Sequence, residues 1–375
     1  MRKKLVLISV DGCGIYNLAH MPFLKSLMKE GYSTVTDSMF PTLTDLVHTT
    51  VMTGVEPRVH GIVENGYYDR VEDRRVNFYD YEVAFNPHSV IRAPTMVDIL
   101  RREGILTASV SGYMMPPFSG TDVRIFPPFF SNDSMYRKHG RDWRKDVWVL
   151  NSALYLYEEC HPDLLLVHFA SVDGMQHEYG PMSDGALKAV KTVDEAIKTL
   201  WNNMNEEYAF IILADHGQEE VHTWVNLREY LRQMGIETKR VSSGGGVHVY
   251  LRDPKERYEA FEALRKAPGV GAVFLREELP YLDGPMSGEL LVSAKPGYWF
   301  CSHSKCHGIK GVSYWVKGMH GSMNEPVVKV PLILWGFEER EVNVEGRGLM
   351  DVAPTVLRFF NVEKPSDMVG KSMIR

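Results

Sequence analysis

The chain has 375 residues, 44% of them hydrophobic and 24% charged, which is the composition of a soluble globular protein and excludes a largely disordered or fibrous one. Its formal net charge of -6 provides no overall basic field for a nucleic-acid polymer, so we expect no such partner. The length suits one large core that carries a smaller inserted unit.

The first apolar segment predicts a strand rather than an export signal. Residues 2–4 are basic, but the apolar run Leu5 to Val10 is short for a signal sequence and ends at Asp11. No uninterrupted apolar stretch approaches the roughly 20 residues that cross a bilayer. We therefore expect a soluble, cytoplasmic protein that acts without a membrane. The four cysteines form no disulfide-rich framework.

Predicted strands and helices alternate along most of the chain. Short apolar runs typical of strands buried on both faces occur at 5–10, 164–169, 210–214 and 330–335. Helical patterns occur at 22–30, 45–52, 94–102 and 186–204. This alternation predicts an α/β fold with a mostly parallel central sheet and helices on both faces.

The pattern changes between these core segments. Residues 225–234 indicate a helix, 244–246 are glycines, and 247–251 and 270–275 alternate like half-exposed strands. We therefore predict an inserted α+β cap at about 221–316, above a core formed by 1–220 and 317–375. The glycine run lacks the lysine and hydroxyl residue of a phosphate-binding loop, which favours a turn in the cap.

Residue types that bind divalent metals recur at turns after the predicted strands. They are Asp11, Thr44, Asp173, His177, Asp215, His216 and His320. A parallel sheet gathers its strand ends at one edge, so the fold can bring these side chains together. Each also has an ordinary structural interpretation: a turn-forming Asp, a helix-capping Thr44, or a histidine bonded to a backbone carbonyl.

The order and context of these residues resemble a known family. Asp11, Pro41 to Thr44, Thr53-Gly54, His60 to Asn65, Asp173 to His177, Asp215 to Gly217 and His320-Gly321 occur in sequence. With this arrangement the chain resembles the type I phosphodiesterase/nucleotide pyrophosphatase family of the alkaline phosphatase superfamily. The resemblance spans nearly the whole core but not the cap, and it implies an alkaline-phosphatase-like core.

The resemblance implies two metal ions, typically zinc, with manganese as an alternative. One ion would be held by Asp173, His177 and His320, and the other by Asp11, Asp215, His216 and the Thr44 hydroxyl. Thr44 matches the family's nucleophile, which implies in-line attack of its metal-bound alkoxide on phosphorus and a phospho-threonine intermediate that water cleaves. Asn65 matches a residue that donates a hydrogen bond to a phosphoryl oxygen. The expected substrate is a small phosphodiester or nucleotide.

One departure from the family leaves the substrate open. Asp45-Leu46-Val47 replaces the Phe-Pro-Asn of the extracellular nucleotide pyrophosphatases, although His48 matches. We expect Asp45 to complement the dipole of the helix that it begins. The alternatives are a phosphonoacetate-type C–P hydrolase, a phosphomonoesterase or phosphomutase, whose usual serine nucleophile is absent, and an inactive binding protein on the same scaffold.

Two further segments carry weaker signals. Residues 113–143 contain Phe118, Phe126, Phe129 and other aromatic residues among prolines, and could clamp a nucleobase; packing onto the core is the favoured interpretation. The run Cys301 to His307 holds two cysteines and two histidines. Such compact spacing, without a companion pair elsewhere, argues against a structural zinc site.

Overall fold

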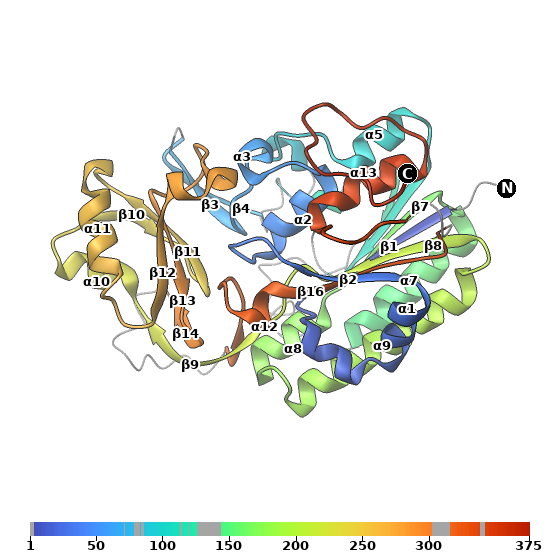
Figure 1. The fold of residues 1–375 in the computed structure, drawn as a ribbon, viewed down its shortest axis with the longest axis horizontal. Helices are drawn as coiled ribbons and strands as arrows, with labels where there is room; N and C mark the ends of the chain where they lie inside the picture. The colour runs from blue at the N-terminus through green and yellow to red at the C-terminus, as the bar shows by residue number, and fades with distance from the viewer. Residues whose placement is uncertain are drawn as a thin grey trace.

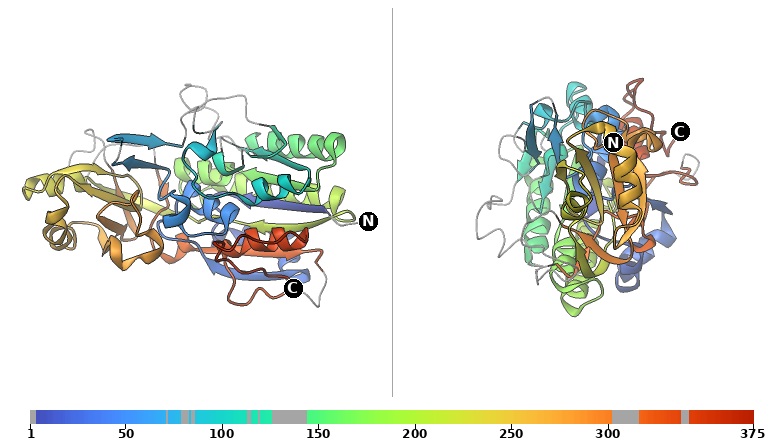
Figure 2. Two further views of the ribbon diagram at one scale, coloured as in Figure 1. Left: turned by 90° about the horizontal axis from the view of Figure 1, so that it is seen from above. Right: turned by 90° about the vertical axis from the view of Figure 1, so that its left-hand side faces the viewer.

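The computed structural model describes residues 4–70, 72–78, 83, 86–112, 115–118, 120–125, 144–301, 316–337 and 342–375. A large layered core and a smaller unit lie along the long axis of the molecule (Figure 1). The smaller unit extends from one end of the core (Figure 2).

A seven-stranded sheet forms the centre of the core. Its strands, in spatial order, are β2 (Tyr32–Asp37), β16 (Lys329–Trp335), β8 (Tyr208–Leu213), β1 (Lys4–Val10), β7 (Leu164–Phe169), β5 (Thr107–Ser111) and β6 (Val123–Ile125). The five strands from β8 to β6 pair in parallel, whereas β16 is antiparallel to both of its neighbours. The predicted α/β class with a mostly parallel sheet is confirmed.

Helices cover the sheet on both sides (Figure 1). One group is α1 (Pro22–Glu30), α7 (Arg144–Cys160), α8 (Ser171–Tyr179) and α9 (Asp184–Met204). The other is α2 (Thr44–Thr53), α5 (Met96–Arg102) and α13 (Val352–Phe359). Because both faces are covered, β1, β7 and β8 are buried along almost their whole length, as their continuous apolar runs predict.

The smaller unit has its own sheet and hydrophobic cluster. Its antiparallel strands are β10 (Thr238–Val241), β11 (Gly246–Leu251), β13 (Leu290–Ala294) and β12 (Val270–Leu275), in that order. Helices α10 (Leu227–Gln233) and α11 (Arg257–Leu264) contribute Leu231 and Leu264 to the cluster. The three strands β14 (Gly297–Phe300), β9 (Glu219–Val225) and β15 (Gly318–Met319) form a third sheet beside it. The boundaries at 221 and 316 stay a prediction.

The prediction that β11 is half-exposed is wrong, because all six of its residues are buried. Its second face is covered by the core segment around Val63: His248 Nε2 donates to the Val63 carbonyl at 3.2 Å, and the Tyr250 hydroxyl lies 3.2 Å from Glu64 Oε1. Strand β12 is half-exposed as expected.

Several short elements complete the described chain. They are α3 (Pro57–His60), α12 (Glu325–Val328), the hairpin of β3 (Gly66–Asp69) and β4 (Arg74–Asn77), and the 3-10 helices Ile15–His20, Pro87–Ser89, Pro116–Phe118, Pro254–Glu256, Arg276–Glu278, Pro280–Leu282 and Leu349–Asp351. None of the helices in the described ranges combines the length and the apolar character that crossing a membrane requires.

The buried His248 predicts a pH dependence of stability. Its Nδ1 accepts the Gly288 N–H at 3.1 Å, and burial lowers its pKa from 6.5 to about 3. Only the unfolded chain then binds this proton between those pH values, so the free energy of unfolding falls as pH falls, by about 1.4 kcal/mol per pH unit from this residue. The free energy of unfolding is measured with urea at several values between pH 6 and pH 4. Its decrease per pH unit should be smaller by that amount in His248→Gln than in wild type. Parallel profiles of wild type and variant would contradict this.

Candidate metal centre

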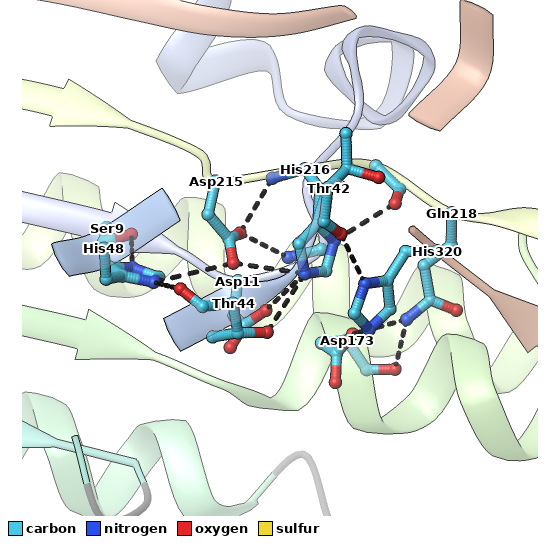
Figure 3. Close-up of polar contacts among 12 residues, drawn as sticks. Ser9, Asp11, Thr42, Thr44, His48, Asp173, Asp215, His216, Gln218 and His320 are labelled. Atoms are coloured by element: carbon cyan, nitrogen blue, oxygen red, sulfur yellow. Dashed lines mark hydrogen bonds and ion pairs between the residues drawn. The ribbon is translucent and has the colours of Figure 1, made fainter. Parts of the chain in front are cut away.

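The predicted ligands meet at the carboxyl edge of the central sheet (Figure 3). Asp11 directly follows β1, Asp173 lies in the first turn of α8 just after β7, and Asp215 and His216 come soon after β8. Since β8, β1 and β7 are parallel neighbours, their ends lie side by side. Each of these four side chains is therefore placed by a buried strand.

Close backbone packing brings the turns together. Gly12 has φ +72°, and a Cβ atom there would lie 2.8 Å from the Cα of Asp173, so a larger residue would push α8 away. The Gly12 N–H donates to Asp215 Oδ1 at 3.1 Å, and the N–H of His216 donates to the same oxygen at 2.9 Å. One oxygen of the Asp215 carboxylate is thus fixed by backbone donors.

The three histidines of the predicted ligand set carry their proton on the same ring nitrogen. Nδ1 lies 2.7 Å from the Gly318 carbonyl in His177, 3.1 Å from the Gly217 carbonyl in His216, and 2.7 Å from the Thr42 carbonyl in His320. A carbonyl oxygen only accepts, so Nδ1 carries the proton in each ring. The carbonyl bonds expected of ordinary histidines are therefore present, and they direct Nε2 toward the carboxylates, as in metal-binding histidines.

Ligand atoms converge in two groups. Asp173, His177 and His320 each place one ligand atom within 4.8 Å of the others, and Asp11, Asp173 and His216 form a second such group. The first matches the set that the resemblance implies. In the second, Asp173 stands where Asp215 was expected, although Asp215 Oδ2 is 3.1 Å from His216 Nε2.

The contacts around His216 fit a bound cation. Burial lowers the pKa of His216 well below 6.5, so Nε2 is an unprotonated acceptor. Nevertheless the carboxylate oxygens Asp215 Oδ2 and Asp11 Oδ1 lie 3.1 and 3.5 Å from it, and the former has no hydrogen-bond partner among the described residues. Acceptors facing one another in a buried space are the arrangement that a metal ion stabilises.

The protonation of the other ligands follows from their surroundings. Burial lowers the pKa of His320 to about 4. For Asp173, burial opposes ionisation, but the charge and hydrogen bond of His177 hold the pKa below its usual range. Burial, followed by the charge of Asp173, raises the pKa of Asp215. The two carboxyl groups thus compete for negative charge unless a cation lies nearby.

Thr44 does not act as a helix cap. It is the first residue of α2, whose N-cap residue is Leu43, with no capping hydrogen bond from a side chain. Its hydroxyl instead lies 3.1 Å from His216 Nε2, and the side chain is almost fully buried. The main-chain carbonyl of Thr44 accepts from His48 Nδ1 at 2.9 Å, and His48 Nε2 lies 2.7 Å from the Ser9 hydroxyl. The helix start is therefore fixed with the hydroxyl facing the metal ligands.

Asp45 occupies a buried position at the start of α2. It lies in the first turn of α2, as predicted, but its side chain is fully buried and neither carboxyl oxygen has a hydrogen-bond partner among the described residues. Burial, with the charge of Asp215, raises its pKa well above the usual value. Burial thus disfavours the ionised form, and the expectation that a charged Asp45 complements the helix dipole stays a prediction.

Asn65 lies between the start of α2 and an open cleft. Its Oδ1 accepts the Asp45 N–H at 3.0 Å, which directs its amide donor elsewhere. The cleft has a volume of about 610 Å³ and is lined by Asn65, by the ligands His177 and His320, and by residues of β10 and α10. Substrate could reach the ligand cluster through this opening.

The glycine run 244–246 lies against the backbone of His320 and Gly321. The Gly245 N–H donates to the His320 carbonyl at 2.8 Å, and Gly246 begins β11. A Cβ atom on Gly246 would lie 2.0 Å from the Gly321 carbonyl oxygen. The predicted turn thus allows the smaller unit to approach the His320 backbone closely.

Three supporting residues were not singled out from the sequence. His168 lies inside β7, where it reads as part of the strand, and its Nε2 is 3.1 Å from Asp11 Oδ2. Gln218 Nε2 donates to Asp173 Oδ1 at 2.5 Å. Asp146 accepts from the backbone N–H groups of Ala170 and Ser171 at the start of α8, at 3.0 and 3.1 Å. Only Gln218, next to the Asp215 to Gly217 motif, carried a local signal.

Most of the weaker sequence features lie outside the described residues. Phe118 is described: it is buried and its ring lies edge-on to those of His48 and His168, as the packing interpretation expects. Phe126 and Phe129, and residues 302–307 of the Cys/His run, fall outside the described ranges.

Fold and site together define an α/β protein whose clustered Asp and His side chains can hold metal beside a buried threonine. Residues 5–323 match the family model for type I phosphodiesterase / nucleotide pyrophosphatase. This match covers most of the chain, which therefore belongs to that family.

Curated relatives agree with this assignment. The chain is 27% identical over 228 residues to ectonucleotide pyrophosphatase/phosphodiesterase family member 3 of Rattus norvegicus, covering 58% of this chain and 25% of that protein. It is 29% identical over 231 residues to venom phosphodiesterase 2 of Crotalus adamanteus, covering 58% and 27%. The matched region thus spans about a quarter of the length of these relatives.

Solved structures share the fold. Phosphonoacetate hydrolase from Sinorhizobium meliloti 1021, in complex with phosphonoformate, superposes with a TM-score of 0.74 at 18% identity, over 96% of this chain and 95% of that one. An inactive threonine-to-alanine form of murine ectonucleotide pyrophosphatase / phosphodiesterase 5, in complex with AMP, has a TM-score of 0.72 at 17% identity over the full length of both chains.

The contacts of Asp146 predict a loss of stability on its removal. Asp146→Ala would leave two buried N–H donors at the start of α8 without their acceptor, and we expect it to lower the free energy of unfolding by about 3 kcal/mol. Asp146→Asn, which keeps one acceptor oxygen, should cost less. The measurement is urea unfolding, with Asp184→Ala, an exposed residue in the first turn of α9, as control. Equal effects of Asp146→Ala and the control would refute this role.

Proposed function

We propose that this protein is a two-metal hydrolase of phosphoric esters, with phosphodiester or nucleotide pyrophosphate bonds as substrates and Thr44 as nucleophile. The observation that carries the proposal is the position of the Thr44 hydroxyl, 3.1 Å from His216 Nε2 and buried beside two groups of potential metal ligands. Packing of the Thr44 side chain alone would not explain why three carboxylates lie at the same sheet edge.

The metal assignment uses the residues that converge. One ion would be held by Asp173, His177 and His320. The other would be held by Asp11 and His216 with Asp215 and Thr44, whose oxygens both lie 3.1 Å from His216 Nε2. The mixed Asp and His donors favour zinc, with manganese as an alternative. Bound ions would supply Lewis-acid stabilisation of negative charge on the reacting oxygens. The contact of Asp215 Oδ2 with an acceptor nitrogen supports a cation at this point.

The chain's own groups position the reaction. The Thr44 Oγ loses its proton and attacks phosphorus, the bond to the leaving oxygen breaks, and that oxygen takes up a proton as a phosphate ester of Thr44 forms. Water then hydrolyses that ester, releasing phosphate or a phosphomonoester and restoring the hydroxyl. The Asn65 amide, held by the Asp45 N–H, donates to a phosphoryl oxygen beside the start of α2. His48 holds the Thr44 main chain, which fixes the direction of attack.

The relatives support the substrate class. The curated relatives carry phosphodiesterase and nucleotide pyrophosphatase names, and the murine structural neighbour holds AMP in a form inactivated by replacing a threonine. The fold shared with phosphonoacetate hydrolase favours cleavage of a C–P bond as the second candidate. The cytoplasmic location expected from the sequence stays a prediction.

Replacement of Thr44 tests the nucleophile. Wild-type protein is assayed with bis-p-nitrophenyl phosphate, p-nitrophenyl phosphate, ATP and phosphonoacetate in the presence of zinc or manganese, and preference for the first or third is expected. Thr44→Ala should lower kcat by about a thousandfold or more on every substrate, whereas Thr44→Ser should keep part of the rate. Metal content and melting temperature serve as controls. A normal rate in Thr44→Ala would exclude this nucleophile.

Metal analysis tests the ligand assignment without an activity measurement. We expect about two zinc ions per chain after reconstitution and about one in His320→Ala, because one of the two groups loses a ligand. The exposed His222 on β9 provides the matched control, and His222→Ala should bind as much metal as wild type. Equal metal content in His320→Ala and wild type would remove His320 from the centre.

A further inference from the structure

The cleft beside the ligand cluster is lined by a concentration of positive charge. Arg75, Arg228, Lys239 and Arg240 lie along it, whereas Glu64 is its single carboxylate among the described lining residues. The whole chain, by contrast, carries a formal net charge of -6. The cleft is therefore locally positive although the net charge of the chain is negative.

These cations come from three separate elements. Arg75 lies on the hairpin strand β4, Arg228 on α10, and Lys239 and Arg240 on β10. The same cleft is lined by His177, His320 and Asn65. The basic side chains thus share one opening with two metal ligands and with the proposed phosphoryl-binding amide.

The described carboxylates neutralise little of the charge of Arg228 and Lys239. Glu64 is almost fully buried and pairs with Arg240 at 3.7 Å, so its charge is directed at that one arginine. Lys239 Nζ lies 3.8 Å from Asp73, whose side chain is 80% exposed and screened by water. Arg228 is exposed and forms no ion pair with any residue that the structure describes. Solvent and an incoming anion would therefore meet a net positive wall.

We propose that this cleft is a subsite for a second anionic group of the substrate, a phosphate or a carboxylate separate from the phosphoryl group that reacts. The inference rests on the proposed function for the position of the reacting group. In addition, the charge of the substrate portion outside the metal centre would determine selectivity. The selecting residues are Arg75, Arg228, Lys239 and Arg240.

The lining favours an anion over a flat apolar group. Tyr68 is the single aromatic residue of the described lining, and Lys239 Nζ lies 5.2 Å from the centre of its ring. A base clamp would require two exposed ring faces. Guanidinium and ammonium groups in a concave site instead match phosphate and carboxylate, by paired hydrogen bonds and by charge.

A double variant on the smaller unit tests the subsite. Arg228→Gln/Lys239→Gln removes two exposed cations, and we expect kcat/KM to fall about tenfold for ATP, or for phosphonoacetate if the second anion is a carboxylate. Bis-p-nitrophenyl phosphate, which has no second anion, should change less than about twofold. Added NaCl should reduce kcat/KM for the affected substrate more in wild type than in the variant, because salt screens exposed charges.

Lys255→Gln/Lys266→Gln is the matched control, since it removes the same charge from exposed positions of the smaller unit outside the cleft lining. An equal loss in both double variants, or an equal loss on all substrates, would overturn the subsite.

ATP and phosphonoacetate binding to Thr44→Ala, measured by calorimetry with and without Arg228→Gln/Lys239→Gln, separates this proposal from the proposed function. Tighter binding when the cations are present supports the subsite even if wild type cleaves none of the substrates, and unchanged affinity for both ligands would refute it.

Discussion

The convergence of three carboxylates at one sheet edge is the constraint on which the rest of this site depends. Asp11 and Asp215 are fully buried and Asp173 is half-buried beside them, so like charges there repel strongly. A protein without positive charge there would protonate one of them, as the raised pKa of Asp215 indicates. Burial lowers the pKa of His216 and His320, so among the three nearby histidines it is mainly His177 whose charge favours the ionised form of Asp173.

The proposed divalent cations would resolve this conflict, and the surrounding hydrogen bonds are compatible with them. Backbone carbonyls hold the three ligand histidines in a single tautomer, and Gly12 lets α8 approach the Asp215 turn. These contacts are made by the chain itself, so the ligand positions are fixed before metal binds. A site organised in this way loses little conformational freedom on loading.

The sequence could place Asp11, Asp173 and Asp215 at one sheet edge because each comes soon after a recognisable buried strand. Their role as metal ligands stays a prediction. Apolar runs such as 164–169 mark strands covered on both faces, and the residues next to them must lie at the edge. Strands β2 and β5 were missed because their sequences, YSTVTD and TASVS, are short and polar, although β5 is fully buried. Their places are set by tertiary packing and not by local preference.

The supporting residues were missed for a related reason. His168 is one residue within an apolar strand, and Asp146 lies 24 positions before its partner Ala170, so only the folded chain brings each to its partner. The basic cleft is also built from residues far apart in the sequence, because β4 ends at Asn77 and β10 begins at Thr238. A cluster of charges from three elements far apart in the sequence has no local motif that could predict it.

The connections of the smaller unit explain how its cations can act at a defined distance from the ligands. The chain enters this unit through β9, just after His216, and returns through β15, directly before His320. Met319 pairs with Glu219 across these two strands.

Glu219 also accepts hydrogen bonds from Ser322 at 2.6 Å and from Asn324 at 2.7 Å, so one buried carboxylate joins both connections. Both crossings are therefore anchored beside metal ligands, and a shift of the smaller unit would strain His216 and His320 together. The walls of the cleft and the ligands are held as one arrangement, which is what discrimination by charge between substrates requires.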